Sequence, residues 1–435
     1  MIKKFFSKEN TLKLLGFACA IPLSIEIRNA EVFVLYFLLF IPLGLTLLAR
    51  NKFERINLTP IDKVCGVFLS WALITFSISL FQILSADGGN IVPRIVSTIS
   101  LMAYIAFPYL LGRLVFKTYD EIQPFIYGLF VGLILSCIII LINYGASINP
   151  TMTGEELIGH RLPFVVGFIF LLVLSENRPL WILFIATFLA TSIVLLSETK
   201  AVIGAFIVSL LIALVAFSKV YSRKKIIVLI ISGLLALVMS INVSPQLNNR
   251  VINFYATIEQ VLHKMDAAVV KDAAVVKDAY LIDPGTDMRV KIWRNLWSKV
   301  TDNLQHIIFG FGQLGPSYIS DPQIYISGHV ASHLSAHSEY LDIIVRSGFV
   351  GLAIYLILIA TFVTLVLRKT EVTFQVRFIY SHNVVALLGV MVYGFFHETT
   401  RYPYFGVLFY LLMGAFSSIY ANSLSRLQME KEVRI

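Results

Sequence analysis

The chain alternates between long apolar runs and shorter polar connections. Most of the runs are about 17 to 25 residues long, the length that an α-helix needs to cross a bilayer. Because a backbone inside a bilayer must form its own hydrogen bonds, such repeated runs predict a bundle of membrane-spanning helices. The predicted spans cover residues 11–27, 31–49, 63–84, 94–116, 123–143, 162–177, 179–197, 200–217, 225–243, 347–367, 378–396 and 403–421. The fold class is therefore an all-α membrane protein with about twelve transmembrane helices.

One long polar segment, residues 244–338, interrupts this pattern between the ninth and tenth spans. Loops of this size usually have a function or are disordered. We therefore divide the chain into spans one to nine (1–243), a large loop with amphipathic helices (244–338), and a final part (339–435) in which a loop-to-membrane helix precedes the last three spans.

Two amphipathic helices are predicted within this loop, at 248–264 and 287–304. The second has an apolar face formed by Val290, Ile292, Trp293, Leu296, Trp297, Val300 and Leu304. A tandem repeat, DAAVVK at 266–271 and again at 272–277, lies between the two helices. We assign no chemistry to this repeat.

Composition and charge agree with a membrane protein. The chain is 57% hydrophobic and 14% charged, with a formal net charge of +9. Most Lys and Arg residues outside the large loop occupy the two tails and every second short connection. The other short connections hold only Arg28, Arg94, Arg161, Lys200 and Arg401. The positive-inside rule therefore predicts that both termini are cytoplasmic and that the large loop is on the outer side, so the basic charge requires no nucleic acid.

The sequence contains no nucleotide-binding loop, no Gly-x-Ser-x-Gly element and no paired metal ligands at standard spacing. Cys19, Cys65 and Cys137 all fall inside predicted spans, where they are typical small apolar residues. We expect neither a metal nor another cofactor. A reaction on the outer side would then need a substrate that carries its own activation.

Arg289 is an unusual residue for its position. It falls in the middle of the apolar face of 287–304 and in the first turn of that helix, after a predicted Asp287 cap. The helix dipole disfavours a cation at this end, so Arg289 needs an anionic partner. That partner is either a bound anion or a carboxylate elsewhere in the protein, unless the side chain extends to water.

His337 begins an amphipathic helix that leads from the loop back into the membrane. The apolar face that follows it contains Tyr340, Leu341, Ile344 and Gly348. Asp342 and Arg346 lie opposite, as an i,i+4 pair that we expect to be solvated. The imidazole of His337 is accordingly expected at the membrane surface, in either a structural or a catalytic role. Gly348 and Gly351 have a spacing that permits close approach of a neighbouring helix.

Three further cations lie on the outer rim. Lys200 is in the tight turn between the seventh and eighth spans, where it either pairs with Glu198 or faces a lipid phosphate. Arg161 and Arg401 each have a histidine nearby and are weaker candidates of the same kind.

The order His337-Ser338, nine residues, then Gly348-x-x-Gly351 resembles the His-[Asn/Ser/Gln]-x9-Gly-x-x-Gly motif of the O-antigen ligases. Residues 287–312 are also similar to that family's Arg-x-x-x-Trp helix and the Gly-x-Gly turn that follows it. The resemblance covers the architecture throughout and the sequence from about 195 to 352. It departs from the family at Lys200, where relatives commonly have arginine. Lysine keeps the positive charge but cannot form the bidentate hydrogen bonds of arginine.

The resemblance implies a GT-C-like bacterial inner-membrane glycosyltransferase with a periplasmic active site. The donor would be undecaprenyl-diphosphate-linked O-antigen, and the acceptor a sugar hydroxyl of lipid A–core. Arg289, Lys200, Arg161 and Arg401 are the candidates that bind the diphosphate; Arg289 would also act in catalysis by stabilising the charge on the leaving group. His337 is the candidate base for the acceptor hydroxyl.

Other functions remain open at this point. An O-antigen polymerase would use the same donor but a second lipid-linked glycan as acceptor. A protein O-glycosyltransferase would use the same chemistry on protein. A flippase for lipid-linked oligosaccharides is disfavoured, because the predicted spans are nearly free of charge and the outer cations gather on one rim.

Overall fold

The computed structural model describes residues 7–20, 36–50, 57–85, 105–146, 178–197, 200–217, 222–244, 248, 292–294, 296–312, 325–326, 329–330, 338–368, 374–394 and 403–433. Helices account for almost all of them. In chain order these are α2 (Lys8–Ala20), the π-helix η2 (Tyr36–Phe40), α4 (Ile41–Arg50), α5 (Pro60–Ser85), α7 (Tyr119–Ala146), α10 (Leu180–Leu196), α11 (Lys200–Phe217), α12 (Arg223–Val243), α15 (Leu304–Phe309), α16 (Glu339–Leu367), α17 (Phe374–Gly394) and α18 (Pro403–Val433). Residues Ile105–Val115, 292–294 and 296–300 are also helical.

These helices agree with the apolar pattern of the sequence. The described part of each predicted span is helical, except for 162–177, which lies outside the described residues. Within the described chain, five helical segments are long and apolar enough to cross a membrane. They are Pro60–Phe81, Tyr119–Ile142, Arg223–Val243, Glu339–Leu367 and Gly406–Ser425.

The outward faces of several helices are apolar. On α5 the exposed side chains include Leu73, Ile74 and Phe81, and on α12 they include Leu234 and Val238. Contiguous apolar surface of this kind is unusual on a soluble protein but matches a lipid environment. The chain is thus a helical membrane protein.

The large loop is described only in part. The predicted helix 248–264, apart from Asn248, and the DAAVVK repeat lie outside the described residues. The later part contains the helical residues 292–294 and 296–300, α15, and two short antiparallel strands, β1 (Tyr325–Ile326) and β2 (His329–Val330). The loop, predicted as mainly helical, therefore also includes a small β-ladder. Its limits at 243 and 338 stay a prediction.

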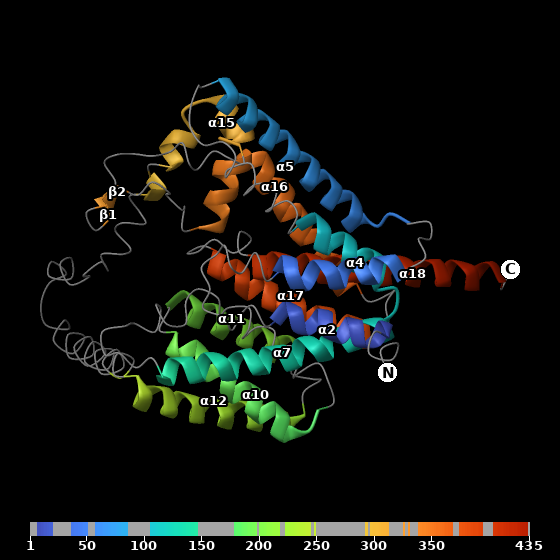
Figure 1. Cartoon of the computed structure of the whole chain (residues 1–435), viewed down its shortest axis with the longest axis vertical. Coiled ribbons are helices and arrows are strands. Elements are labelled where there is room, and N and C mark those ends of the chain that lie inside the picture. Colours follow the sequence, from blue (N-terminus) through green and yellow to red (C-terminus); the bar gives the residue numbers. More distant parts are fainter. Residues whose placement is uncertain are drawn as a thin grey trace, which may run out of the picture.

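The helices pack in pairs that are often distant in sequence. α2 packs along α7, α10 along α12, α11 along α17, and α5 along α16. Figure 1 shows α5 and α16 side by side, inclined away from the other helices towards α15. The first residues of α2 and the last residues of α18 lie on the same side of the molecule (Figure 1).

A capping box starts α5. The backbone N–H of Thr59 donates to Asp62 Oδ2 over 2.7 Å, and the Asp62 N–H donates to Thr59 Oγ1 over 3.2 Å. Pro60 occupies the first helical position, where its missing N–H costs nothing. The sequence therefore encodes this helix start locally.

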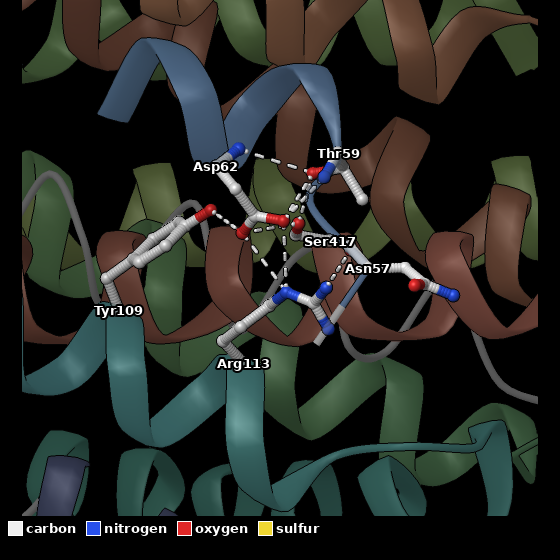
Figure 2. Close-up of polar contacts among 6 residues, drawn as sticks. All are labelled: Asn57, Thr59, Asp62, Tyr109, Arg113 and Ser417. Atoms are coloured by element: carbon white, nitrogen blue, oxygen red, sulfur yellow. Dashed lines mark hydrogen bonds and ion pairs between the residues drawn. The ribbon is translucent and has the colours of Figure 1, made fainter. Parts of the chain in front are cut away.

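The carboxylate of Asp62 also connects α5 to the helix Ile105–Val115 and to α18 (Figure 2). Tyr109 and Arg113, on the helix Ile105–Val115, donate to Asp62 over 2.6 and 3.1 Å. Ser417 of α18 donates over 3.0 Å. Arg113 is only 8% exposed and also donates to the carbonyl of Asn57 over 2.6 Å. The ion pair is buried, and the hydrogen bonds around it offset the cost of removing both charges from water.

Candidate active site

Helix α16 is broken at Gly348. The backbone there has φ 67° and ψ −176°, which divides the helix into a short loop segment, residues 339–347, and a long membrane segment, residues 349–367. A side chain at a positive φ is strained, so glycine is the residue that suits this position. The break lies where the sequence changes from an amphipathic pattern to an apolar run.

α15 lies directly against this break. A Cβ at Gly348 would lie 2.0 Å from the carbonyl oxygen of Ile308, and a Cβ at Gly310 would lie 2.5 Å from that of Val345. The Phe311 N–H donates to the same Val345 oxygen over 2.7 Å. The two backbones are therefore in contact, which confirms the close approach predicted for Gly348 and explains the Gly-x-Gly turn after α15.

Trp71 of α5 holds this junction from the other side. Its indole N–H donates to the carbonyl of Ser347 over 2.9 Å, next to the break. Its ring stacks on Phe309 of α15, with centroids 5.3 Å apart. One side chain thus ties together α5, α15 and α16, although nothing in the local sequence pattern singled it out.

We expect Trp71→Phe to lower the stability of this junction modestly. Phenylalanine keeps the stacking on Phe309 but loses the donor to Ser347, a loss of about 1 kcal/mol. Trp71→Ala, which also removes the ring, should cost about 3 to 5 kcal/mol. Melting temperatures in detergent would check this order. Equal losses for the two variants would contradict it.

The loop helix formed by residues 292–294 and 296–300 packs on the loop segment of α16. Ile292, Leu296 and Val300 are buried together with Leu341, Ile344 and Val345. The predicted apolar face is confirmed at these three positions, and Trp293 packs against the same cluster. Trp297 is 50% exposed, yet its ring contacts Phe349, with centroids 5.7 Å apart. The prediction is wrong at its end, since the helix stops at Val300 and Leu304 is instead the first residue of α15.

The pair Asp342–Arg346 corrects a second expectation. Arg346 Nε lies 3.1 and 3.0 Å from the two carboxylate oxygens of Asp342, as an i,i+4 pair. The pair is not solvated, because Asp342 is only 4% exposed. Buried positions occur all around the short segment, so it lies inside the molecule rather than on the surface.

Glu339, the first residue of α16, is 2% exposed. It faces Gly394, the last residue of α17, where an added Cβ would lie 3.2 Å from Glu339 Cβ. Tyr340 donates its hydroxyl to the carbonyl of Met391 over 2.8 Å. The first turn of α16 is therefore fixed against the end of α17.

α17 also contacts α11. A Cβ at Gly389 would lie 1.7 Å from Ser209 Oγ and 3.0 Å from the carbonyl oxygen of Ala205, so these helices approach closely. α11 begins at Lys200. α17 therefore contacts both α11, which begins with Lys200, and α16, which begins two residues after His337.

The side chains of the predicted site are not themselves described. His337, Arg289, Arg161 and Arg401 lie outside the described residues, and Lys200 is described only as the first residue of α11. Three of these five positions adjoin described helices. His337 directly precedes Ser338, the N-cap residue of α16; Arg289 precedes Ile292 by three residues; and Arg401 precedes α18 by two. Their roles stay predictions.

Sequence reasoning missed Glu339. An acidic residue in the first turn of a helix is expected from the helix dipole alone, so it attracted no attention. Only its place two residues after His337 could have marked it. The described residues contain no group of His, Cys, Asp and Glu that could hold a metal ion.

Part of the chain is similar to a known protein family. Residues 163–356 match the family model described as O-antigen ligase. This segment is similar to that family. The matched segment contains Lys200, Arg289, His337 and both motif glycines, so the match confirms the family that the motif predicted. The family implies a membrane enzyme that transfers glycosyl groups in lipopolysaccharide assembly. A search of curated proteins found no match.

Proposed function

We propose that the protein is an O-antigen ligase of the bacterial inner membrane. It transfers the glycan from undecaprenyl-diphosphate-linked O-antigen to a sugar hydroxyl of lipid A–core on the periplasmic face. The observation that carries this proposal is the family match together with the described first part of α16, which contacts α5, α15 and α17.

The proposed topology has about twelve spans with both termini in the cytoplasm. Its support is the distribution of basic residues and the position of the ends of α2 and α18 on one side of the molecule (Figure 1). In this topology α11, α16 and α18 begin at the periplasmic face, and α17 ends there. Lys200, His337 and Arg401 then share that face by their places in the sequence.

The reaction needs no nucleotide, because the lipid diphosphate is already a good leaving group. The acceptor oxygen forms the new bond to the anomeric carbon as the bond from that carbon to the diphosphate oxygen breaks. Arg289 and Lys200, with Arg161 and Arg401, offset the charge that develops on the diphosphate. In the proposed mechanism, these cations take the place of a metal ion. His337 accepts the proton of the acceptor hydroxyl.

The test is the lipopolysaccharide profile of a strain that lacks the gene, complemented with wild type, His337→Ala or Arg289→Ala. We expect wild type to restore the long ladder on core and both variants to fail at normal expression. The matched control is Arg294→Ala on the same loop helix, since Arg294 is exposed and should be dispensable. A full ladder without the gene would refute ligation.

The second candidate is an O-antigen polymerase, which the family match also permits. The same gel separates the two functions. Without a ligase, polymerised glycan accumulates on undecaprenyl diphosphate and core stays bare. Without a polymerase, core carries a single repeat unit.

A further inference from the structure

The first turn of α12 contains three consecutive cations, Arg223, Lys224 and Lys225, and no acidic residue. The helix dipole disfavours cations at this end of a helix, so the isolated helix gains no stability from them. None of the three side chains forms an ion pair within the part of the chain that the structure describes. Their charge is therefore available to a partner outside the protein.

Several other cations that the proposed topology places on the same side of the membrane interact within the protein. These interactions are the ion pairs Lys8–Glu121, Lys13–Glu9 and Arg113–Asp62, and the contact of the Arg178 guanidinium with the ring of Phe130. The first turn of α12 differs from them, because the described residues do not neutralise its positive charge. A general excess of basic residues on one side of the membrane does not explain this difference.

Two of the three cations lie in line with the exposed face of α12. At about 100° per residue, Arg223 shares a row with Ile227, Ile230 and Leu234, and Lys224 shares a row with Ile231 and Leu235. The five apolar side chains are between 47% and 57% exposed, and both cations are exposed as well. The exposed face of α12 is thus cationic at its first turn and apolar beyond it.

Lys225 belongs to the opposite side of the helix. It shares a row with Leu229, Ser232 and Ala236, which are all buried. α12 packs along α10, and Figure 1 shows the two helices side by side at the edge of the molecule. The basic turn therefore presents two cations on the exposed face and a third above the packed side.

The dimensions of the exposed face match one leaflet of a bilayer. From Ile227 to Val238, which is 57% exposed, α12 rises by about 17 Å. Half of a typical hydrocarbon core is about 15 Å thick. At the polar end, an arginine can bind two phosphate oxygens at once, and a lysine beside it adds a point charge. A nucleic acid or an acidic protein would use the cations but not the apolar rows, whereas an anionic phospholipid uses both.

We propose that the exposed face of α12 is a binding surface for an anionic phospholipid. The lipid phosphate lies at Arg223 and Lys224, and an acyl chain lies along the apolar rows as far as Val238. In the proposed topology this lipid belongs to the cytoplasmic leaflet, on the side opposite to glycan transfer. The inference goes beyond the proposed function and does not depend on it, because lipid binding is measured without any glycan.

The experiment measures lipid binding to the full-length protein in detergent by native mass spectrometry. The probes are dioleoyl phosphatidylglycerol and dioleoyl phosphatidylcholine, which have the same chains but differ in net charge. The variants are Arg223→Gln, Lys224→Gln and the two combined. One cation at an anionic lipid surface contributes a factor of about 5, so the double variant should lose about 20- to 30-fold in affinity for phosphatidylglycerol. Its affinity for phosphatidylcholine should change little.

Lys225→Gln is the matched control, because it removes the same charge from the same turn on the other side of the helix. We expect it to weaken binding of phosphatidylglycerol by about 2-fold at most, since it acts only as a more distant, screened charge. None of these side chains forms an ion pair among the described residues, so melting temperatures without added lipid should be unchanged. Added salt should weaken binding in wild type more than in the double variant.

A second measurement locates the lipid. Phosphatidylglycerol and phosphatidylcholine with a photoactivatable acyl chain are incorporated into nanodiscs, and the labelled peptides are identified by mass spectrometry. The phosphatidylglycerol probe should label residues 227–238 more than the phosphatidylcholine probe does, and the double variant should lose this preference. Equal labelling by the two probes, or equal loss of affinity in Lys225→Gln and the double variant, would overturn the inference. The lipopolysaccharide gel tests the proposed function separately.

Discussion

Replacing Gly348 by alanine should abolish stable docking of α15 on α16 and, with it, glycan transfer. The backbone of Gly348, with φ 67° and ψ −176°, costs about 1 to 3 kcal/mol for a residue with a Cβ. The new methyl group would also lie 2.0 Å from the carbonyl oxygen of Ile308, which belongs to backbone and cannot rotate away. We therefore expect a total cost above about 3 kcal/mol, which is a large fraction of the stability of a typical protein.

The matched control for this substitution is Gly233→Ala in α12, where a Cβ would meet nothing within 4 Å. Because alanine is the better helix former, this variant should be neutral or more stable by up to about 1 kcal/mol. Melting temperatures of both variants in detergent, with the lipopolysaccharide gel as activity readout, check the pair. A Gly348→Ala protein with wild-type melting and a normal ladder would contradict the contact between α15 and α16.

Breaking the buried pair Asp62–Arg113 should produce the second large effect. Asp62→Asn keeps the shape of the side chain but leaves Arg113 buried without its counter-charge, at a cost of about 3 to 5 kcal/mol. The matched control is Glu9→Gln, which breaks the more exposed pair Lys13–Glu9 on α2. That change should cost less than about 0.5 kcal/mol.

A double variant sharpens this test. Asp62→Asn combined with Arg113→Met should lose less stability than the two single variants added together, because the second change removes the stranded charge. Melting temperatures of the four proteins in detergent give the comparison. Strict additivity would mean that the two side chains act independently, contrary to the contact shown in Figure 2.

The sequence predicted the helices well because lipid imposes a simple length rule on apolar runs. Boundaries were less accurate where the polar part of a helix continues beyond the apolar run. α18 extends to Val433 rather than 421, and the predicted loop-to-membrane helix and tenth span together form α16, which is broken at Gly348. The loop helix was predicted on the correct face at Ile292, Leu296 and Val300, since helical periodicity is a local property.

The arrangement of the candidate site was harder to predict because it depends on contacts between distant residues. Trp71 and Ser347 are 276 positions apart, and neither is distinctive in its own segment. Asp342 and Arg346 were expected in water because an i,i+4 pair opposite an apolar face usually is solvated. Only the packing of the loop helix and α17 around that segment shows that both of its faces are covered.

The junction at Gly348 also sets an order for biosynthesis. Residues 292–300 and α15 leave the ribosome before Leu341, Ile344 and Gly348, the surface on which they pack. Trp71 enters the bilayer earlier still, and its acceptor, Ser347, is made 276 residues later. The described loop helices therefore have no surface to pack on until α16 has been synthesised. Any factor that delays insertion of α16 would extend the time during which these apolar side chains are exposed.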